Sequence, residues 1–247
     1  MTVTLYQFPI SHYCEKVRWA LEYKGVPYKI KNLLPGQHIK FAKTVAASTC
    51  VPIVRYRDKK GETQYLQESA AIIDWLDATY PDKPLTPASP KEQAAAIAWE
   101  KFADEDIGPH VRRWAYFTLL ENPKVVLPAL TSGAPLLAKP LFRMFFPKVR
   151  EIMKKRMNIY PAESQDSAAR LDAAFANIDA GISGKDFLVG DHFSRADLAV
   201  AALLAPLFTP KQYGVKWPKK IPEPLQSWTA ARLDKLAWAE NIYQNYR

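Results

Sequence analysis

Residues 3–25, VTLYQFPISHYCEKVRWALEYKG, decide the fold of this 247-residue chain. They run from a strand-like pattern, through a turn that contains Pro9, into an amphipathic helix predicted over residues 13–24. Ser11 and Cys14 stand three residues apart where that helix starts. The first turn of a helix presents unpaired backbone N–H groups and the positive end of the helix dipole. The turn therefore predicts a site for an anion, although an ordinary helix N-cap formed by Ser11 explains it equally well.

The next sixty residues complete a compact α/β unit. Gly25 and Pro27 end the helix, and a second strand is predicted over residues 28–33, which makes the first unit βαβ. Residues 34–49 have no clear pattern. A strand over 51–57, a hairpin turn at 58–61, a returning strand over 63–66 and a helix from Ser69 to Tyr80 follow.

The remainder of the chain is predicted to be helical. The proline-rich residues 83–90 indicate a linker, so we expect domains at 1–82 and 91–247 on either side of it. Recurring prolines predict broken or kinked helices between residues 122 and 161. Ser194 and Asp197 have the spacing of a capping box, and the apolar residues 198–207 behind it predict the core helix of the second domain.

Composition narrows the class of protein. A net charge of +9, with 48% hydrophobic and 24% charged residues, is typical of a soluble globular protein that attracts anions. No nucleic-acid-binding motif occurs, so we expect no nucleic-acid partner. Two cysteines form no disulfide framework, and no leader or membrane-spanning pattern is found, so we expect a cytoplasmic protein without stable membrane insertion. Residues 136–149 mix apolar and basic side chains, which fits either a surface helix or contact with a membrane surface.

Three separate pieces of the first domain suggest one kind of ligand. The Ser11 turn suits a thiolate. The Val51–Pro52 bond at a strand entry is a candidate cis bond that would expose the backbone of Val51 to a peptide-like ligand, unless it is an ordinary trans bond at an edge strand. Ser69 can cap a helix and bind a carboxylate beside Glu68, which can pair with an ammonium group, or it is a plain N-cap. Together the pieces describe a site for a short peptide with a free amino-acid end and a thiol.

With these motifs the chain resembles a cytosolic glutathione transferase over its whole length. The resemblance rests on the serine turn before KVRWAL, on Val-Pro, on Gln-Glu-Ser at residues 67–69, on the linker and on the capping box. The Pro-Gly-Gln-His loop at 35–38 is similar to that of the theta class, which uses a catalytic serine. The resemblance implies a thioredoxin-like α/β domain followed by an all-α domain. It also implies a detoxifying homodimer that joins glutathione to a small hydrophobic electrophile without a metal.

The resemblance also assigns roles to individual residues. Ser11 is implied as the catalytic group that hydrogen-bonds the glutathione sulfur. The implied glutathione-binding residues are Gln37 and His38 at the glycyl carboxylate, Val51 and the cis Pro52 at the cysteinyl part, and Glu68 and Ser69 at the γ-glutamyl end. Ser194 and Asp197 are implied to be structural. Cys50 departs from the lysine or glycine that related enzymes often carry before this valine.

Several alternatives compete with these assignments. Cys14 either packs as a small apolar residue or forms a mixed disulfide with glutathione, and Tyr6 is a second candidate thiolate donor. Arg113, Tyr116 and Phe117 are expected at the second-substrate pocket, or else form a core stripe. Two other functions stay open: a glutathione-dependent thiol transferase or reductase that acts through Cys14, and a non-catalytic scaffold that binds glutathione.

Overall fold

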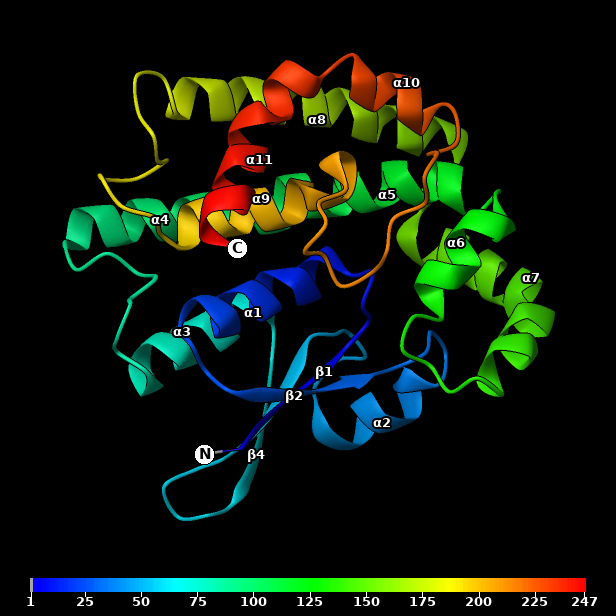
Figure 1. Ribbon diagram of the computed structural model, residues 1–247, viewed down its shortest axis with the longest axis horizontal. Coiled ribbons are helices and arrows are strands. Elements are labelled where there is room, and N and C mark those ends of the chain that lie inside the picture. The colour runs from blue at the N-terminus through cyan, green and yellow to red at the C-terminus, as the bar shows by residue number, and fades with distance from the viewer. Residues whose placement is uncertain (1) are drawn as a thin grey trace.

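The computed structural model describes residues 2–247 and begins with a four-stranded sheet in the order β2-β1-β3-β4. The strands are β1 (Val3–Gln7), β2 (Tyr28–Asn32), β3 (Ile53–Arg57) and β4 (Thr63–Gln67). β1 pairs with β2 in parallel, and it pairs antiparallel with β3, which is antiparallel to β4. α1 (His12–Tyr23) and α3 (Ser69–Thr79) cover one face of this sheet, and α2 (His38–Val45) covers the other (Figure 1). This is the expected thioredoxin-like α/β arrangement.

α1 is buried along most of its length because the helical half of the molecule packs on its outer side. Its charged residues Glu15, Lys16 and Arg18 are therefore buried, where the amphipathic pattern would place them at the surface. Each has an opposite charge nearby: Arg18 pairs with Glu15 at 2.5 Å, and Lys16 pairs with Glu100 at 2.9 Å. Burying charged groups without such partners would be costly.

The connection between the two halves is held in place rather than loose. α3 ends at Thr79 and α4 (Pro90–Phe102) begins at Pro90. In the intervening segment Leu85 is fully buried, and its N–H donates to Asp77 at 3.0 Å. The Lys24 ammonium donates to the same carboxylate at 2.7 Å, so helix α1 also anchors this segment.

The second half is all helical, as expected. η1 (Ala103–Ile107), a π-helix, and α5 (Gly108–Leu119) continue directly from α4. α6 (Pro123–Leu130), α7 (Ala138–Met157), α8 (Pro161–Gly181), α9 (Arg195–Phe208), α10 (Leu225–Ala230) and α11 (Leu233–Tyr246) follow. Figure 1 shows these helices stacked over the α1 side of the sheet, with α6 and α7 at one end.

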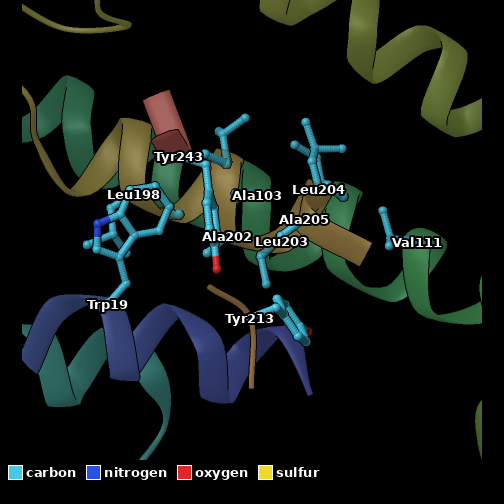
Figure 2. Close-up of a cluster of buried hydrophobic side chains, with 14 of the residues drawn as sticks. Trp19, Ala103, Val111, Leu198, Ala202, Leu203, Leu204, Ala205, Tyr213 and Tyr243 are labelled. Atoms are coloured by element: carbon cyan, nitrogen blue, oxygen red, sulfur yellow. The ribbon is translucent and has the colours of Figure 1, made fainter. Parts of the chain in front are cut away.

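α9 is the centre of the core, as its apolar sequence predicted. Residues 195–205 are all buried, and the helix packs against α1, α4, α5 and α11. Figure 2 shows Leu203 and Leu204 of α9 in a cluster with Trp19 of α1 and Tyr243 of α11. The capping box is present: the Ser194 N–H donates to the Asp197 carboxylate at 2.9 Å, and the Ser194 hydroxyl accepts from the first turn.

Secondary structure differs from the expectations at two places. Residues 38–45 form the amphipathic helix α2, where no regular element was predicted, and Ala42 is its one buried residue. The expected break among the recurring prolines falls between α6 and α7, at residues 131–137, whereas Pro147 lies inside the 20-residue α7. Both Pro147 and Arg143, whose carbonyl loses its partner, are exposed, so water can replace the missing hydrogen bond.

Among residues 2–247, no helix has the length and apolar character needed to cross a membrane. α7 nevertheless exposes apolar side chains, with Met144 at 65% and Phe145 at 52% exposure, beside the exposed Arg143 and Lys148. Whether this face contacts a membrane surface stays a prediction.

Candidate functional site

A cavity of about 400 Å³ lies between the two halves of the molecule. The first half contributes the turn before α1, the loop before α2 and the loop before β3. The second half contributes α5, α6, α7 and the segment that joins α9 to α10. The same cavity therefore collects several of the residues predicted from sequence, together with a largely apolar wall that sequence did not delimit.

Ser11 lies at the cavity wall as the N-cap of α1. Its backbone is extended, and its Oγ accepts a hydrogen bond from the Cys14 N–H at 3.3 Å. Because Oγ acts as the acceptor in this bond, the hydroxyl hydrogen can be donated to another group. The hydroxyl and the positive end of α1 thus face the same space, which is suited to an anion.

The next two residues, His12 and Tyr13, also line the cavity and attach it to the helical half. His12 Nε2 lies 3.1 Å from the Gly108 carbonyl oxygen, and the Tyr13 hydroxyl donates to the Asp104 carbonyl at 2.6 Å. Burial lowers the pKa of His12 to about 3. The imidazole is therefore neutral near neutral pH, and it acts as a hydrogen-bond donor to Gly108 rather than as a cation.

The two alternative thiolate groups lie outside the cavity wall. Cys14 is fully buried, and burial raises the pKa of its thiol, although the charge of Arg18 and the Ser11 hydroxyl partly oppose this. Tyr6 is 6% exposed and stacks on Phe41 of α2, with ring centroids 4.3 Å apart. The structure thus brings neither side chain to the space that Ser11 faces.

The loop before α2 brings His38 to the cavity but leaves Gln37 exposed and outside the wall. The Gly36 N–H donates to His38 Nδ1 at 3.1 Å, so Nε2 carries the ring hydrogen. Burial lowers the pKa of His38. A neutral Nε2–H donor, rather than an imidazolium charge, is therefore what His38 offers to a ligand carboxylate.

The loop before β3 places Val51 at the wall, and the Val51–Pro52 peptide bond is cis, as predicted. Val51 lies just outside β3, and its backbone N–H and C=O form no hydrogen bond with any described residue. Gln67 orders the residues before it, because its Nε2 donates to the carbonyls of Ser48 at 3.0 Å and Cys50 at 2.7 Å. The free N–H and C=O at the cavity edge can pair with an extended peptide.

Glu68 and Ser69 start α3, beside the cavity rather than in its wall. The prediction that Ser69 caps this helix was wrong: Glu68 is the N-cap, Ser69 is the first helical residue, and no side chain caps the first turn. Ser69 is buried, whereas Glu68 is exposed and has a φ of 75°, a left-handed conformation that is unusual for a residue with a side chain. The charges of Glu68 and Asp104 both contribute to the raised pKa of Tyr13, so the two carboxylates lie near one another at this end. The sequence analysis did not identify Asp104, because its position beside Tyr13 and Glu68 depends on how η1 packs.

On the helical side, the structure separates the three predicted residues. Tyr116 lines the cavity. Arg113 is instead a structural residue that donates to the Met157 carbonyl at 3.1 Å and to Ser167 at 2.8 Å, and Phe117 stacks on Trp114. Arg112, which the sequence analysis did not select, lines the cavity. Residues 112 and 113 lie four and three positions before 116, so both are helix-face neighbours of Tyr116 and helical spacing alone does not distinguish them.

No group of three or more His, Cys, Asp or Glu side chains within residues 2–247 is placed to hold a metal ion. Both cysteines are free thiols. The polar groups in the cavity wall are those of the serine turn, the histidines, the backbone of Val51 and the arginines.

Two family models match the chain. The model for the glutathione S-transferase N-terminal domain covers residues 5–84, and the model for the C-terminal domain of the same family covers residues 135–223. Glutathione S-transferase U2 of Arabidopsis thaliana is 34% identical over 109 residues, 44% of this chain. That alignment spans 46% of the length of the relative, a little under half.

Solved structures share the fold at low sequence identity. FzlA from C. crescentus has a TM-score of 0.66 at 19% identity and covers 100% of this chain and 89% of its own. A glutathione S-transferase from Methylobacterium radiotolerans, in complex with glutathione sulfonate, has a TM-score of 0.63 at 18% identity, with 99% and 92% covered. At these identities the structures show the fold alone, and the theta-like serine features stay a prediction. The two domain models, matched in the expected order on the thioredoxin-like and helical halves, show that this chain belongs to the glutathione S-transferase family.

Proposed function

We propose that this protein binds glutathione and transfers it to a small hydrophobic electrophile, with Ser11 stabilising the thiolate. The observation that carries the proposal is the presence of Ser11, His38 and the unpaired backbone of Val51 on one cavity wall. These groups match the thiol, the glycyl carboxylate and the central peptide unit of glutathione. Val51 supplies the N–H and C=O for an antiparallel pair with the cysteinyl residue.

The γ-glutamyl end is assigned to the start of α3. Ser69 and the first N–H groups of that helix suit a carboxylate. The Glu68 carboxylate, with Asp104 nearby, suits the ammonium group. Gln37 keeps a role only if its exposed side chain reaches the glycyl carboxylate from outside the wall.

The reaction needs little more than a stabilised thiolate beside an apolar chamber. Glutathione gives its thiol proton to solvent, and the sulfur then attacks the electrophilic carbon. In a substitution the S–C bond forms, the bond to the leaving group breaks, and that group departs with its electron pair. Tyr116 and the apolar residues of α5–α7 hold the electrophile and exclude water.

Calorimetry with glutathione, followed by conjugation of a chloronitroarene, tests the proposal. Micromolar to millimolar binding is expected, since that range is usual for enzyme substrates. Val51→Pro removes the N–H and should weaken glutathione binding, whereas Val125→Ala, on the helical side of the cavity, should not. Failure of the wild-type protein to bind glutathione would refute the proposal.

The thiol-transferase alternative is separable from this one. It requires a mixed disulfide at Cys14, which is fully buried. Mass spectrometry after incubation with oxidised glutathione should show no adduct on Cys14. Binding without turnover of any electrophile would favour the scaffold alternative.

The remaining family properties are proposals for this chain. We expect a homodimer in solution, testable by light scattering, and a cytoplasmic location, testable by fractionation of the source cells. We also retain domain boundaries at 1–82, 83–90 and 91–247.

A further inference from the structure

Arg112 is an unpaired cation in the wall of the cavity. It belongs to none of the ion pairs found among residues 2–247, and its Nε is buried without a hydrogen-bond partner. Its neighbour Arg113, by contrast, is fully engaged with Met157 and Ser167. A guanidinium in a partly buried position is stabilised when an anion pairs with it, and this fold supplies none.

The surroundings of Arg112 select against a cation and for an anion. Within the described part of the chain, no aspartate or glutamate lines this cavity, whereas Arg156 provides a second positive charge at α7. Most of the wall around them is apolar and includes Val111, Ala115, Leu119, Val126 and Trp217. The charge of Arg112 also contributes to the lowered pKa of His12, which places the guanidinium near the turn that carries Ser11.

The position of Arg112 separates it from the groups proposed to bind the carboxylates of glutathione. The sites proposed above for the two glutathione carboxylates are His38 and the start of α3, both in the first half of the chain. Arg112 lies on α5, which belongs to the helical half in Figure 1. That half provides the apolar side of the cavity, where the second substrate is expected.

We propose that the second substrate is an amphipathic acid, a hydrophobic electrophile whose carboxylate pairs with Arg112. This inference rests on the proposed transferase function and names its substrate class. The planar guanidinium can hold a carboxylate through two parallel hydrogen bonds, which fixes the orientation of the substrate. The apolar wall then receives the hydrophobic body, and the electrophilic carbon lies toward Ser11.

A matched pair of electrophiles tests the charge preference. A chloronitrobenzoate and the corresponding chloronitrobenzamide share the ring and the leaving group: the thiolate sulfur bonds to the ring carbon, and chloride leaves with the electron pair of the C–Cl bond. After correction for their uncatalysed rates, kcat/KM for the benzoate should exceed that for the benzamide by about 10- to 100-fold, as for a hydrogen bond to a charged group. Arg112→Gln should abolish this preference, lowering kcat/KM for the benzoate by about 10- to 100-fold more than kcat/KM for the benzamide.

Two further variants complete the comparison. Arg112→Lys keeps the positive charge but cannot form two parallel hydrogen bonds to a carboxylate, so it should retain part of the preference for the benzoate. Arg143→Gln removes an equal charge from an exposed position of α7 outside the cavity wall, and it should change neither rate. Equal loss of both substrates in Arg112→Gln would overturn the inference and show that Arg112 serves the glutathione thiolate.

A binding measurement separates this inference from the transferase proposal. Naphthoate and naphthamide are unreactive, so calorimetry reads the charge preference whether or not the protein conjugates anything. Tighter binding of naphthoate, lost in Arg112→Gln, supports the inference. Equal affinity of the wild-type protein for both compounds refutes it, even if conjugation is observed.

Discussion

Ser11→Ala should remove two hydrogen bonds, one observed and one proposed, and their effects can be measured separately. One is the N-cap bond from the Cys14 N–H, 3.3 Å long, whose loss costs about 1 kcal/mol of stability. The other is the bond that Ser11 is proposed to donate to the glutathione thiolate. Hydrogen bonds to charged groups contribute about 1.5–3 kcal/mol, which corresponds to a rise of about 1–2 units in the pKa of the bound thiol.

The assay is an ultraviolet titration of the glutathione thiolate bound to the wild-type protein and to Ser11→Ala. At a pH below both pKa values, the thiolate population and the conjugation rate should fall about 10- to 100-fold in the variant. At high pH the two rates should converge, because the thiol then ionises without help.

Ser194→Ala is the matched control. Ser194 is also an N-cap, and its Oγ accepts the Ala196 N–H at the same 3.3 Å, but it lies at α9 and outside the cavity wall. It should lower the free energy of unfolding and leave the bound thiol pKa unchanged. An unchanged thiol pKa in Ser11→Ala, with glutathione still bound, would remove Ser11 from the mechanism.

Three other predictions concern the structure that supports the site. Gly108→Ala puts a Cβ into the space of the Tyr13 hydroxyl, so it should destabilise the fold by about 1–3 kcal/mol in urea titrations and weaken glutathione binding; the cost should largely vanish in a Tyr13→Ala background. Arg195→Met removes the buried pair with Glu100 at 2.5 Å and leaves Lys16, at 2.9 Å, as the remaining partner of that carboxylate, so it should cost about 1.5–3 kcal/mol, whereas the exposed Arg170→Met should cost under about 1 kcal/mol. Burial lowers the pKa of His12 from its ordinary 6.5 to about 3 in the folded state, so the unfolded chain binds one more proton between these values. Stability should therefore fall by up to about 1.4 kcal/mol per pH unit as pH drops through this window. His12→Gln should flatten that slope in urea titrations at successive pH values, and an unaltered slope would contradict the assignment.

The local elements were predictable because their signals are short-range. Ser11, Gly25 and Pro27 bracket α1, and Ser194 with Asp197 marks the start of α9; each acts on its own neighbours through backbone geometry or capping. The bond before Pro52 is cis, as the family resemblance implied; its place at a strand entry made it a candidate and left the trans form open. α2 escaped prediction because Pro35 and Gly36 just before it indicated a loop and the helix is only eight residues long, although it is amphipathic.

The candidate site was predictable only in the first half of the chain. Ser11, His38 and Val51 belong to motifs within the α/β unit, where chain order largely determines which loops meet. Arg112 and Arg113 are adjacent in sequence, and nothing local says which one turns into the cavity. That choice depends on how α5 packs against α8, where Ser167 captures Arg113.

The residues alone therefore indicated the α/β order, the caps at Ser11 and Ser194 and the turn before α1, because each depends on interactions within a few positions of the chain. Only the packed structure decided that Cys14 is buried, that Tyr6 stacks on Phe41, and that His38 is held as a neutral donor. Only packing, too, left Arg112 without a partner in an apolar wall. These features arise from contacts between segments distant in sequence, whose desolvation and charge pairing no local pattern encodes.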